Sequence, residues 1–125
     1  MYVLETGAKP IGPYSPLRTA EGFLYCSGHI GIDSAGALVP GGIREETRQA
    51  LENLSQTLRE SGGRMQEVVK TTVYLTDIND FTAMNEIYAE YFRAPYPARA
   101  TVQVAALPKG ACIEIEAVAM KKMIS

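Results

Sequence analysis

The chain has 125 residues, of which 46% are hydrophobic, and its twelve basic and fourteen acidic side chains give a formal charge of −2. This length and composition predict a single domain over residues 1–125, with enough apolar side chains to form a core. The acidic balance argues against a surface for nucleic acid or an anionic membrane. Any anion site must therefore be local.

The sequence shows no targeting segment, and its cysteines and histidine form no recognisable motif. A charge appears by Glu5, and no apolar stretch reaches the length of a signal sequence or a membrane span. We therefore expect a cytoplasmic protein with no membrane partner. Cys26 and Cys112 form no C-x-x-C pair, which favours reduced buried thiols over a disulfide. His29 is the only histidine, so a Ser-His-Asp triad or a zinc site is disfavoured, and we predict no metal.

The N-terminal half predicts a stiff lead-in, a hairpin and a helix. Three prolines within residues 9–16 push the backbone into extended shapes. The β-prone run 23–27 and the glycines that follow it predict a hairpin of early strands. Over residues 44–61 the apolar positions recur every three or four residues, which indicates an amphipathic helix that stops at Gly62 and Gly63.

The C-terminal half predicts strand, helix, strand, strand. Residues 68–75 alternate in polarity and are rich in β-branched side chains, as in a strand with two used faces. Residues 77–80 supply capping side chains for a helix that starts at Phe81 and lasts until Pro95, and its aromatic stripe favours core packing. Strands at 98–105 and 111–120 are joined by a turn at 107–110. The element order predicts an α+β fold, with a mixed or antiparallel sheet backed by two helices.

The last strand indicates that the protein self-associates. Residues 113, 115, 117 and 119 form one apolar side, while Val118 and Met120 lie on the other. Two helices can cover only one face of such a sheet. A homo-oligomer is the natural way for a small domain to cover the second face.

Two kinds of side chain could carry chemistry. Arg99 follows Pro97 at a strand start, where a fixed backbone can aim a planar guanidinium at a carboxylate, although an ordinary surface ion pair fits the same residue. Glu114 and Glu116 project from one strand face about 7 Å apart. Such a pair suits general acid or base catalysis, and a solvated polar face is the alternative.

Tyr14 and Ser27 are weaker candidates. Tyr14 lies between Pro13 and Pro16, which would hold a phenol in place at little entropic cost, but it could equally fill space. Ser27 precedes Gly28, so its hydroxyl could face a ligand or simply form a turn. No glycine pattern of a phosphate-binding loop is present.

Several blocks, in this order and spacing, resemble the Rid family of reactive-intermediate deaminases, also called the YjgF family. The likeness runs essentially from end to end. The blocks are residues 11–16 (IGPYSP), 25–28 (YCSG), 79–81 (NDF), 97–99 (PAR), 107–109 (LPK) and 113–117 (IEIEA).

The resemblance implies a chorismate-mutase-like α+β fold assembled as a homotrimer, with active sites in the clefts between subunits. It also implies hydrolysis of reactive 2-imino acids, released by pyridoxal-phosphate enzymes, to 2-oxo acids and ammonia without a cofactor. By position, Arg99 is similar to the family's carboxylate-binding arginine and Glu114 to its water-positioning acid. Tyr14, Ser27 and Thr101 match positions that line the pocket.

Two positions depart from the resemblance. Thr101 stands where some relatives carry cysteine, and we expect this change to tune activity. His29 stands where glutamine is usual, either altering the polarity or pH response of the pocket or serving as a tolerated neighbour of the site.

The expected reaction needs few groups. Arg99 would clamp the carboxylate, while Glu114 and nearby backbone groups would hold the attacking water and move its proton. Two other functions compete with the deaminase. One is a non-enzymatic trimer that binds a small carboxylate and regulates a partner. The other is a ribonuclease or translation inhibitor, against which the acidic composition argues.

Overall fold

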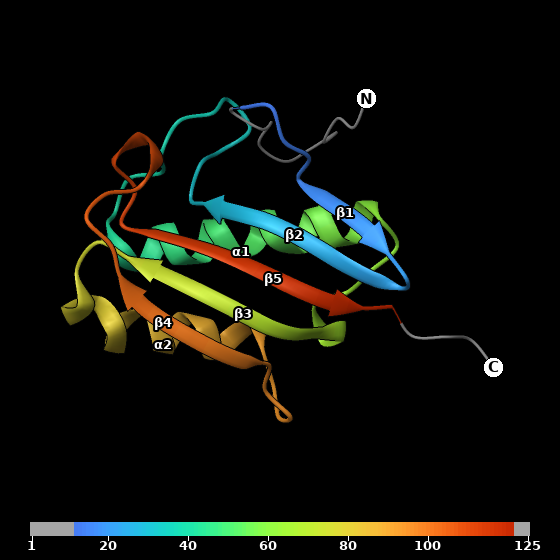
Figure 1. The fold of residues 1–125 in the computed structure, drawn as a ribbon. Coiled ribbons are helices and arrows are strands. Elements are labelled where there is room, and N and C mark those ends of the chain that lie inside the picture. Colours follow the sequence, from blue (N-terminus) through green and yellow to red (C-terminus); the bar gives the residue numbers. More distant parts are fainter. Residues whose placement is uncertain (1–11, 122–125) are drawn as a thin grey trace.

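The computed structural model describes residues 12–121 as a mixed five-stranded sheet with two α-helices (Figure 1). The lead-in at residues 9–16 therefore lies partly outside the described residues. The start of the chain up to Glu5 lies wholly outside them. The elements in chain order are β1 (Leu17–Ala20), β2 (Phe23–Ile30), α1 (Ile43–Glu60), β3 (Val68–Leu75), α2 (Phe81–Tyr91), β4 (Ala98–Gln103) and β5 (Ile113–Met120).

The strands lie in the order β1-β2-β5-β3-β4. All neighbours are antiparallel except β3 and β4, which are parallel. A parallel pair needs a crossover, and α2 supplies it. This arrangement confirms the predicted α+β class, with a mixed sheet backed by two helices.

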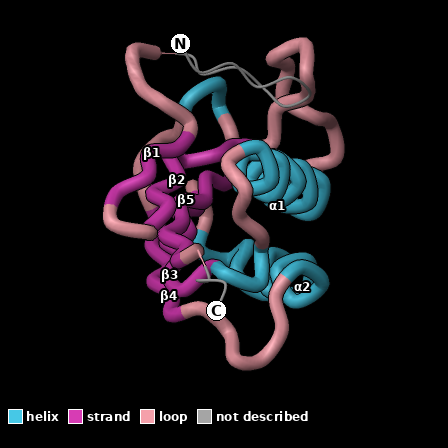
Figure 2. Tube along the Cα trace, turned by 90° about the vertical axis from the view of Figure 1, so that its right-hand side faces the viewer, coloured by secondary structure: helices cyan, strands magenta, loops and turns pink. Residues whose placement is uncertain are grey.

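Both helices cover the same face of the sheet, as the side view makes plain (Figure 2). The core lies between these two layers. The predicted stripe of α1, which includes Leu51, Leu54 and Leu58, is fully buried there, and so are Ile113 and Ile115 of β5. Burying such side chains contributes about 1.5–3 kcal/mol each, which is why the 3.6-residue period gives the helix position so clearly.

The other face of the sheet carries large side chains that this chain leaves uncovered. Tyr25 is 47% exposed and Met120 is 50% exposed. Val118, paired with Tyr25, belongs to the same face. Within residues 12–121 no element covers these side chains (Figure 2). The predicted division of β5 into a helix side and an open side is therefore confirmed.

The ends of α2, β4 and β5 differ from the predicted ones. The second helix stops at Tyr91, short of Pro95, because Phe92 leaves helical geometry and packs in the core against Tyr88, with ring centroids 4.5 Å apart. The last two strands are shorter than expected, ending at Gln103 and starting at Ile113. No helix within the described residues is long and apolar enough to cross a membrane.

Candidate functional site

Arg99 lies on β4, the edge strand, and its side chain packs against α2. Its register partner on β3 is Thr71, which is buried on the helix side. The guanidinium carbon lies 4.7 Å from the ring centroid of Tyr88 and 5.5 Å from that of Phe81. Each such cation–π contact contributes about 0.5–1 kcal/mol at an exposed site. Two rings and a strand therefore fix the position of the cation.

Tyr88 is itself held by a hydrogen bond to β3. Its hydroxyl lies 2.7 Å from the Thr71 hydroxyl, and the two share a buried hydrogen bond. Burial raises the pKa of Tyr88, while the bond to Thr71 and the neighbouring Arg99 oppose that rise. The phenol therefore stays neutral at physiological pH and leaves the guanidinium charge available for an anion.

A pocket of about 460 Å³ opens beside Arg99. Asn85, Tyr88 and Tyr96 line it together with Pro97. Thr101 does not line it, although it is two residues from Arg99 on the same strand. The Thr101 hydroxyl is buried and has no hydrogen-bond partner among the described residues. A buried hydroxyl left this way is costly, and the Thr47 hydroxyl in the core shares this state.

Glu114 lies in a second pocket, of about 440 Å³, on the open face of the sheet. Tyr14 and Ser27 line the same pocket, as does Glu116. The Ser27 hydroxyl donates to the Ser15 carbonyl at 2.6 Å, which ties the lead-in to β2. Three of the predicted site residues, Tyr14, Ser27 and Glu114, therefore meet in one place.

The Glu114 carboxylate sits over Gly28 on the neighbouring strand. A Cβ atom at Gly28 would be 2.0 Å from Oε2 of Glu114, so only glycine leaves room for this carboxylate. Burial raises the pKa of Glu114, and the charge of Glu116 raises it further. A carboxylate with a raised pKa is a better proton acceptor, as general base chemistry requires.

Arg99 and Glu114 do not meet within one chain. They lie on opposite faces of the sheet, β3 separates their strands, and their pockets share no lining residue. The chain therefore presents two separate pockets. We call these the Arg99 pocket and the Glu114 pocket.

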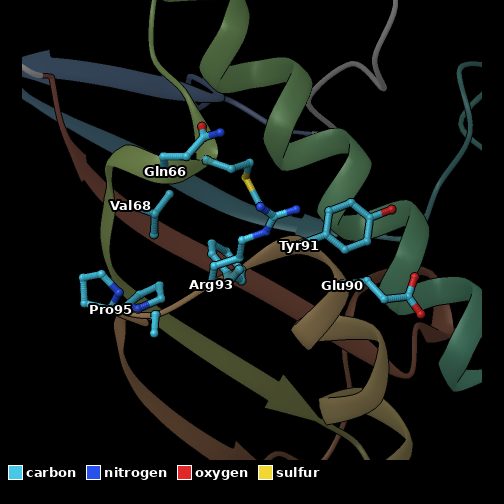
Figure 3. Close-up of a pocket in the computed structure, with 10 residues that line it drawn as sticks. Gln66, Val68, Glu90, Tyr91, Arg93 and Pro95 are labelled. Atoms are coloured by element: carbon cyan, nitrogen blue, oxygen red, sulfur yellow. The ribbon is translucent and has the colours of Figure 1, made fainter.

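A third hollow, of about 490 Å³, holds none of the predicted site residues. Figure 3 shows the Arg93 side chain lying across it between Gln66 and Tyr91. Glu90, which also lines this hollow, forms a salt bridge with Arg48 at 2.5 Å. Tyr91 donates to another carboxylate, that of Glu52, at 2.7 Å. We assign no chemistry to this hollow.

Metal and thiol chemistry find little support in the described part of the chain. No cluster of three or more His, Cys, Asp or Glu side chains that could hold a metal occurs there. Cys26 and Cys112 are free thiols. Burial raises the pKa of Cys26 to about 12 and that of Cys112 to about 11, the latter with help from Glu46. Neither thiol is a ready nucleophile at neutral pH.

Sequence reasoning missed the aromatic neighbours of Arg99. The stripe of α2 was expected to serve core packing alone, yet Phe81 and Tyr88 also cup the guanidinium. Their spacing of seven residues places both on one helix face, which was the available signal. The sequence shows Gly28 only as the neighbour of Ser27, because its closeness to Glu114 depends on strand pairing.

Comparisons with known proteins agree with this fold. Residues 5–121 match the model of the family described as Endoribonuclease L-PSP. A human protein named 2-iminobutanoate/2-iminopropanoate deaminase is 53% identical over 122 residues, covering 95% of this chain and 89% of that protein.

Two solved structures have the same fold. RidA from the Antarctic bacterium Psychrobacter sp. PAMC 21119 has a TM-score of 0.89 at 38% identity, with 95% of this chain and 96% of that chain covered. TdcF from E. coli, solved with bound serine, has a TM-score of 0.88 at 34% identity, with 98% and 100% covered. Family model, sequence identity and fold agree over nearly the whole chain, so this protein belongs to the Endoribonuclease L-PSP family, the Rid (YjgF) family that its sequence blocks resemble.

Proposed function

We propose that this protein is a 2-iminobutanoate/2-iminopropanoate deaminase that hydrolyses reactive 2-imino acids to 2-oxo acids and ammonia. The observation that carries the proposal is a guanidinium fixed by two aromatic rings, in a chain that also holds a carboxylate with a raised pKa. The human relative, which bears the name of this activity, supports the same assignment.

The reaction needs orientation and proton transfer. Arg99 binds the substrate carboxylate through two parallel N–H donors, which is the geometry a guanidinium offers to a carboxylate. Glu114 accepts a proton as water attacks the imine carbon and passes it to the nitrogen. When the carbon–nitrogen bond breaks, the second proton of that water leaves the new hydroxyl and also ends on the ammonia. One water is consumed, and the products are the 2-oxo acid and ammonia. No cofactor is required for these steps.

A homotrimer would bring the two half-sites together. In our proposal the Arg99 pocket of one subunit faces the Glu114 pocket of the next, so each cleft has one cation and one acid. The uncovered face with Tyr25 and Met120 supports this assembly, and so does the position of Arg99 on an edge strand. Tyr14 and Ser27 then form part of the wall of the cleft. The Thr101 hydroxyl gains a hydrogen-bond partner there.

The proposed function also bears on the domain organisation, the cellular location and the partners of the protein. We assign the whole chain, residues 1–125, to one domain. Its two free cysteines suit the reducing cytoplasm. The net charge of −2 gives no support to nucleic acid as a partner, despite the family's description as an endoribonuclease.

A coupled assay tests the activity. Threonine dehydratase generates 2-iminobutyrate in a buffer free of reactive amines, and release of 2-oxobutyrate is followed with and without this protein. The release rate should rise in proportion to added protein, and RNA incubated with the same preparation should stay intact. A release rate that does not change over a wide range of protein concentration would favour the carboxylate-binding regulator instead.

Light scattering at micromolar concentration tests the assembly. We expect the mass of a trimer. A monomeric mass would leave the two half-sites apart and would remove the proposed cleft.

A further inference from the structure

His29 is buried beneath the Glu114 pocket, on the helix side of the sheet. It is the only histidine of the chain and is 9% exposed. Its Nδ1 lies 2.7 Å from the carbonyl oxygen of Ser27, and its Nε2 lies 2.8 Å from the hydroxyl of Thr57 on α1. The ring therefore bridges β2 to α1 and does not line the pocket.

These two contacts fix the tautomer of the ring. A carbonyl oxygen can only accept, so Nδ1 carries the hydrogen and donates to Ser27. In the neutral ring Nε2 then accepts, and Thr57 donates to it. Burial lowers the pKa of His29, against a smaller opposing effect of the Ser27 hydrogen bond, so the neutral ring prevails at neutral pH.

A bulge in β2 puts the histidine in this position. Cys26 pairs with Ala117, while His29 pairs with Ile115, so Ser27 and Gly28 both lie opposite a single residue of β5. In a regular strand Cys26 and His29 would face opposite sides. The extra residue turns His29 toward α1 and leaves Ser27 and Gly28 at the pocket.

The bond to His29 also determines where the next amide points. Within the described residues the only cis peptide is Ala94-Pro95, so the Ser27-Gly28 peptide is trans. In a planar trans peptide the N–H points opposite to the C=O. Because the Ser27 carbonyl points at the His29 ring, the Gly28 N–H points away from α1, toward the face where Glu114 rests against Gly28.

We propose that His29 is a positioning residue that locks the Ser27-Gly28 peptide, so that the Gly28 N–H faces the cleft beside Glu114 as a hydrogen-bond donor. A flipped peptide would put a carbonyl beside the carboxylate instead, where the two would repel each other. His29 touches neither the pocket nor the substrate, so it acts only through Gly28. This inference rests on the proposed deaminase activity for its kinetic consequence, while its geometry stands independently of that activity.

Nitrogen NMR of the parent protein tests the geometry without any activity. The imidazole should show the Nδ1–H tautomer, with a bare Nε2 and a slowly exchanging proton on Nδ1. An Nε2–H tautomer would overturn the proposal, because the Ser27 carbonyl would then have no donor. If the protein proves inactive as a deaminase, the proposed function fails. This measurement still decides whether His29 donates to the Ser27 carbonyl and so fixes the Ser27-Gly28 peptide.

Kinetics of a matched pair test the consequence. His29→Asn keeps a donor close to the position of Nδ1, and His29→Leu has nearly the same shape as asparagine without any donor. We expect kcat of the leucine variant to fall roughly tenfold below that of the asparagine variant, with KM within about twofold, since Arg99 still binds the carboxylate. Equal kcat values in two folded variants would reduce His29 to core packing and refute the positioning role.

Discussion

The Arg99 pocket and the Glu114 pocket are built by different means. Arg99 stands on an edge strand, and side chains from a helix hold it, with Tyr88 braced by Thr71 underneath. Glu114 stands on an interior strand and rests on backbone, in a space that a missing Cβ leaves at Gly28. Packing therefore fixes the cation, whereas the absence of a side chain at Gly28 makes room for the acid.

Removing the guanidinium should have the largest effect. Two charge-assisted hydrogen bonds contribute about 1.5–3 kcal/mol each, so Arg99→Ala should lower kcat/KM by at least roughly a hundredfold. Arg99→Lys should recover only part of this loss, because an ammonium lacks the planar fork. Steady-state kinetics with 2-iminobutyrate would measure both variants, and circular dichroism would check folding. A folded, trimeric Arg99→Ala protein with nearly parental activity would show that the carboxylate binds elsewhere.

Removing the acid should affect a different kinetic constant. Glu114→Gln keeps the shape over Gly28 but removes the proton acceptor, so kcat should fall roughly tenfold to a hundredfold while KM changes little. In the parental protein the raised pKa of Glu114 should place the acid limb of the pH–rate profile above the ordinary carboxyl range. A rise in KM at constant kcat would make Glu114 a binding group instead.

Mixing the two variants tests whether the pockets come from different subunits. If each cleft takes Arg99 from one subunit and Glu114 from the next, a trimer containing both Arg99→Ala and Glu114→Gln subunits has one intact cleft. Such mixed trimers should regain about one third of the parental activity, and an unsorted co-expressed population, of which about three quarters is mixed by chance, should regain about one quarter. Activity no higher than the average of the two separate variants would mean that subunits do not share a site.

The smallest effect concerns stability. The folded-state pKa of Glu114 is raised, so the ionised carboxylate opposes folding at pH values above its unfolded pKa. Glu114→Gln should therefore raise the midpoint of thermal unfolding at pH 7 by roughly 1–3 °C. The gain should disappear at about pH 3.5, where the carboxyl is protonated in both states. A loss of stability at pH 7 would mean that Glu114 is stabilised by its surroundings.

Much of the fold was predictable from pattern. The alternation of β5 correctly assigned Ile113 and Ile115 to the core and Glu114 to the open face. The three- and four-residue spacing of leucines gave α1 to within one residue at each end. These predictions succeeded because they depend on one element at a time, where periodicity decides which side is buried.

What failed to emerge from the sequence depends on two elements at once. The bulge at Ser27 and Gly28 exists only relative to the register of β5, and the same is true of the break between Val68 and Lys70. Arg99 meets Tyr88 because β4 runs parallel to β3 beside α2, and nothing in the run 97–99 specifies that pairing. Whether the two pockets face each other depends on a second chain, which the sequence of one chain does not describe.

The parallel pairing of β3 and β4 bears on how this chain can vary in length. Six register pairs, from Lys70 with Ala98 to Leu75 with Gln103, fix Arg99 from the strand side. The connection that precedes β4 does not hold it, and residues 93–96 of that connection are all exposed. Insertions or a spliced tag at residues 93–95 should loop outward and leave the guanidinium where it is. Length polymorphism at 93–95 is thus compatible with an unmoved guanidinium, whereas Tyr96 must keep its place because it lines the Arg99 pocket.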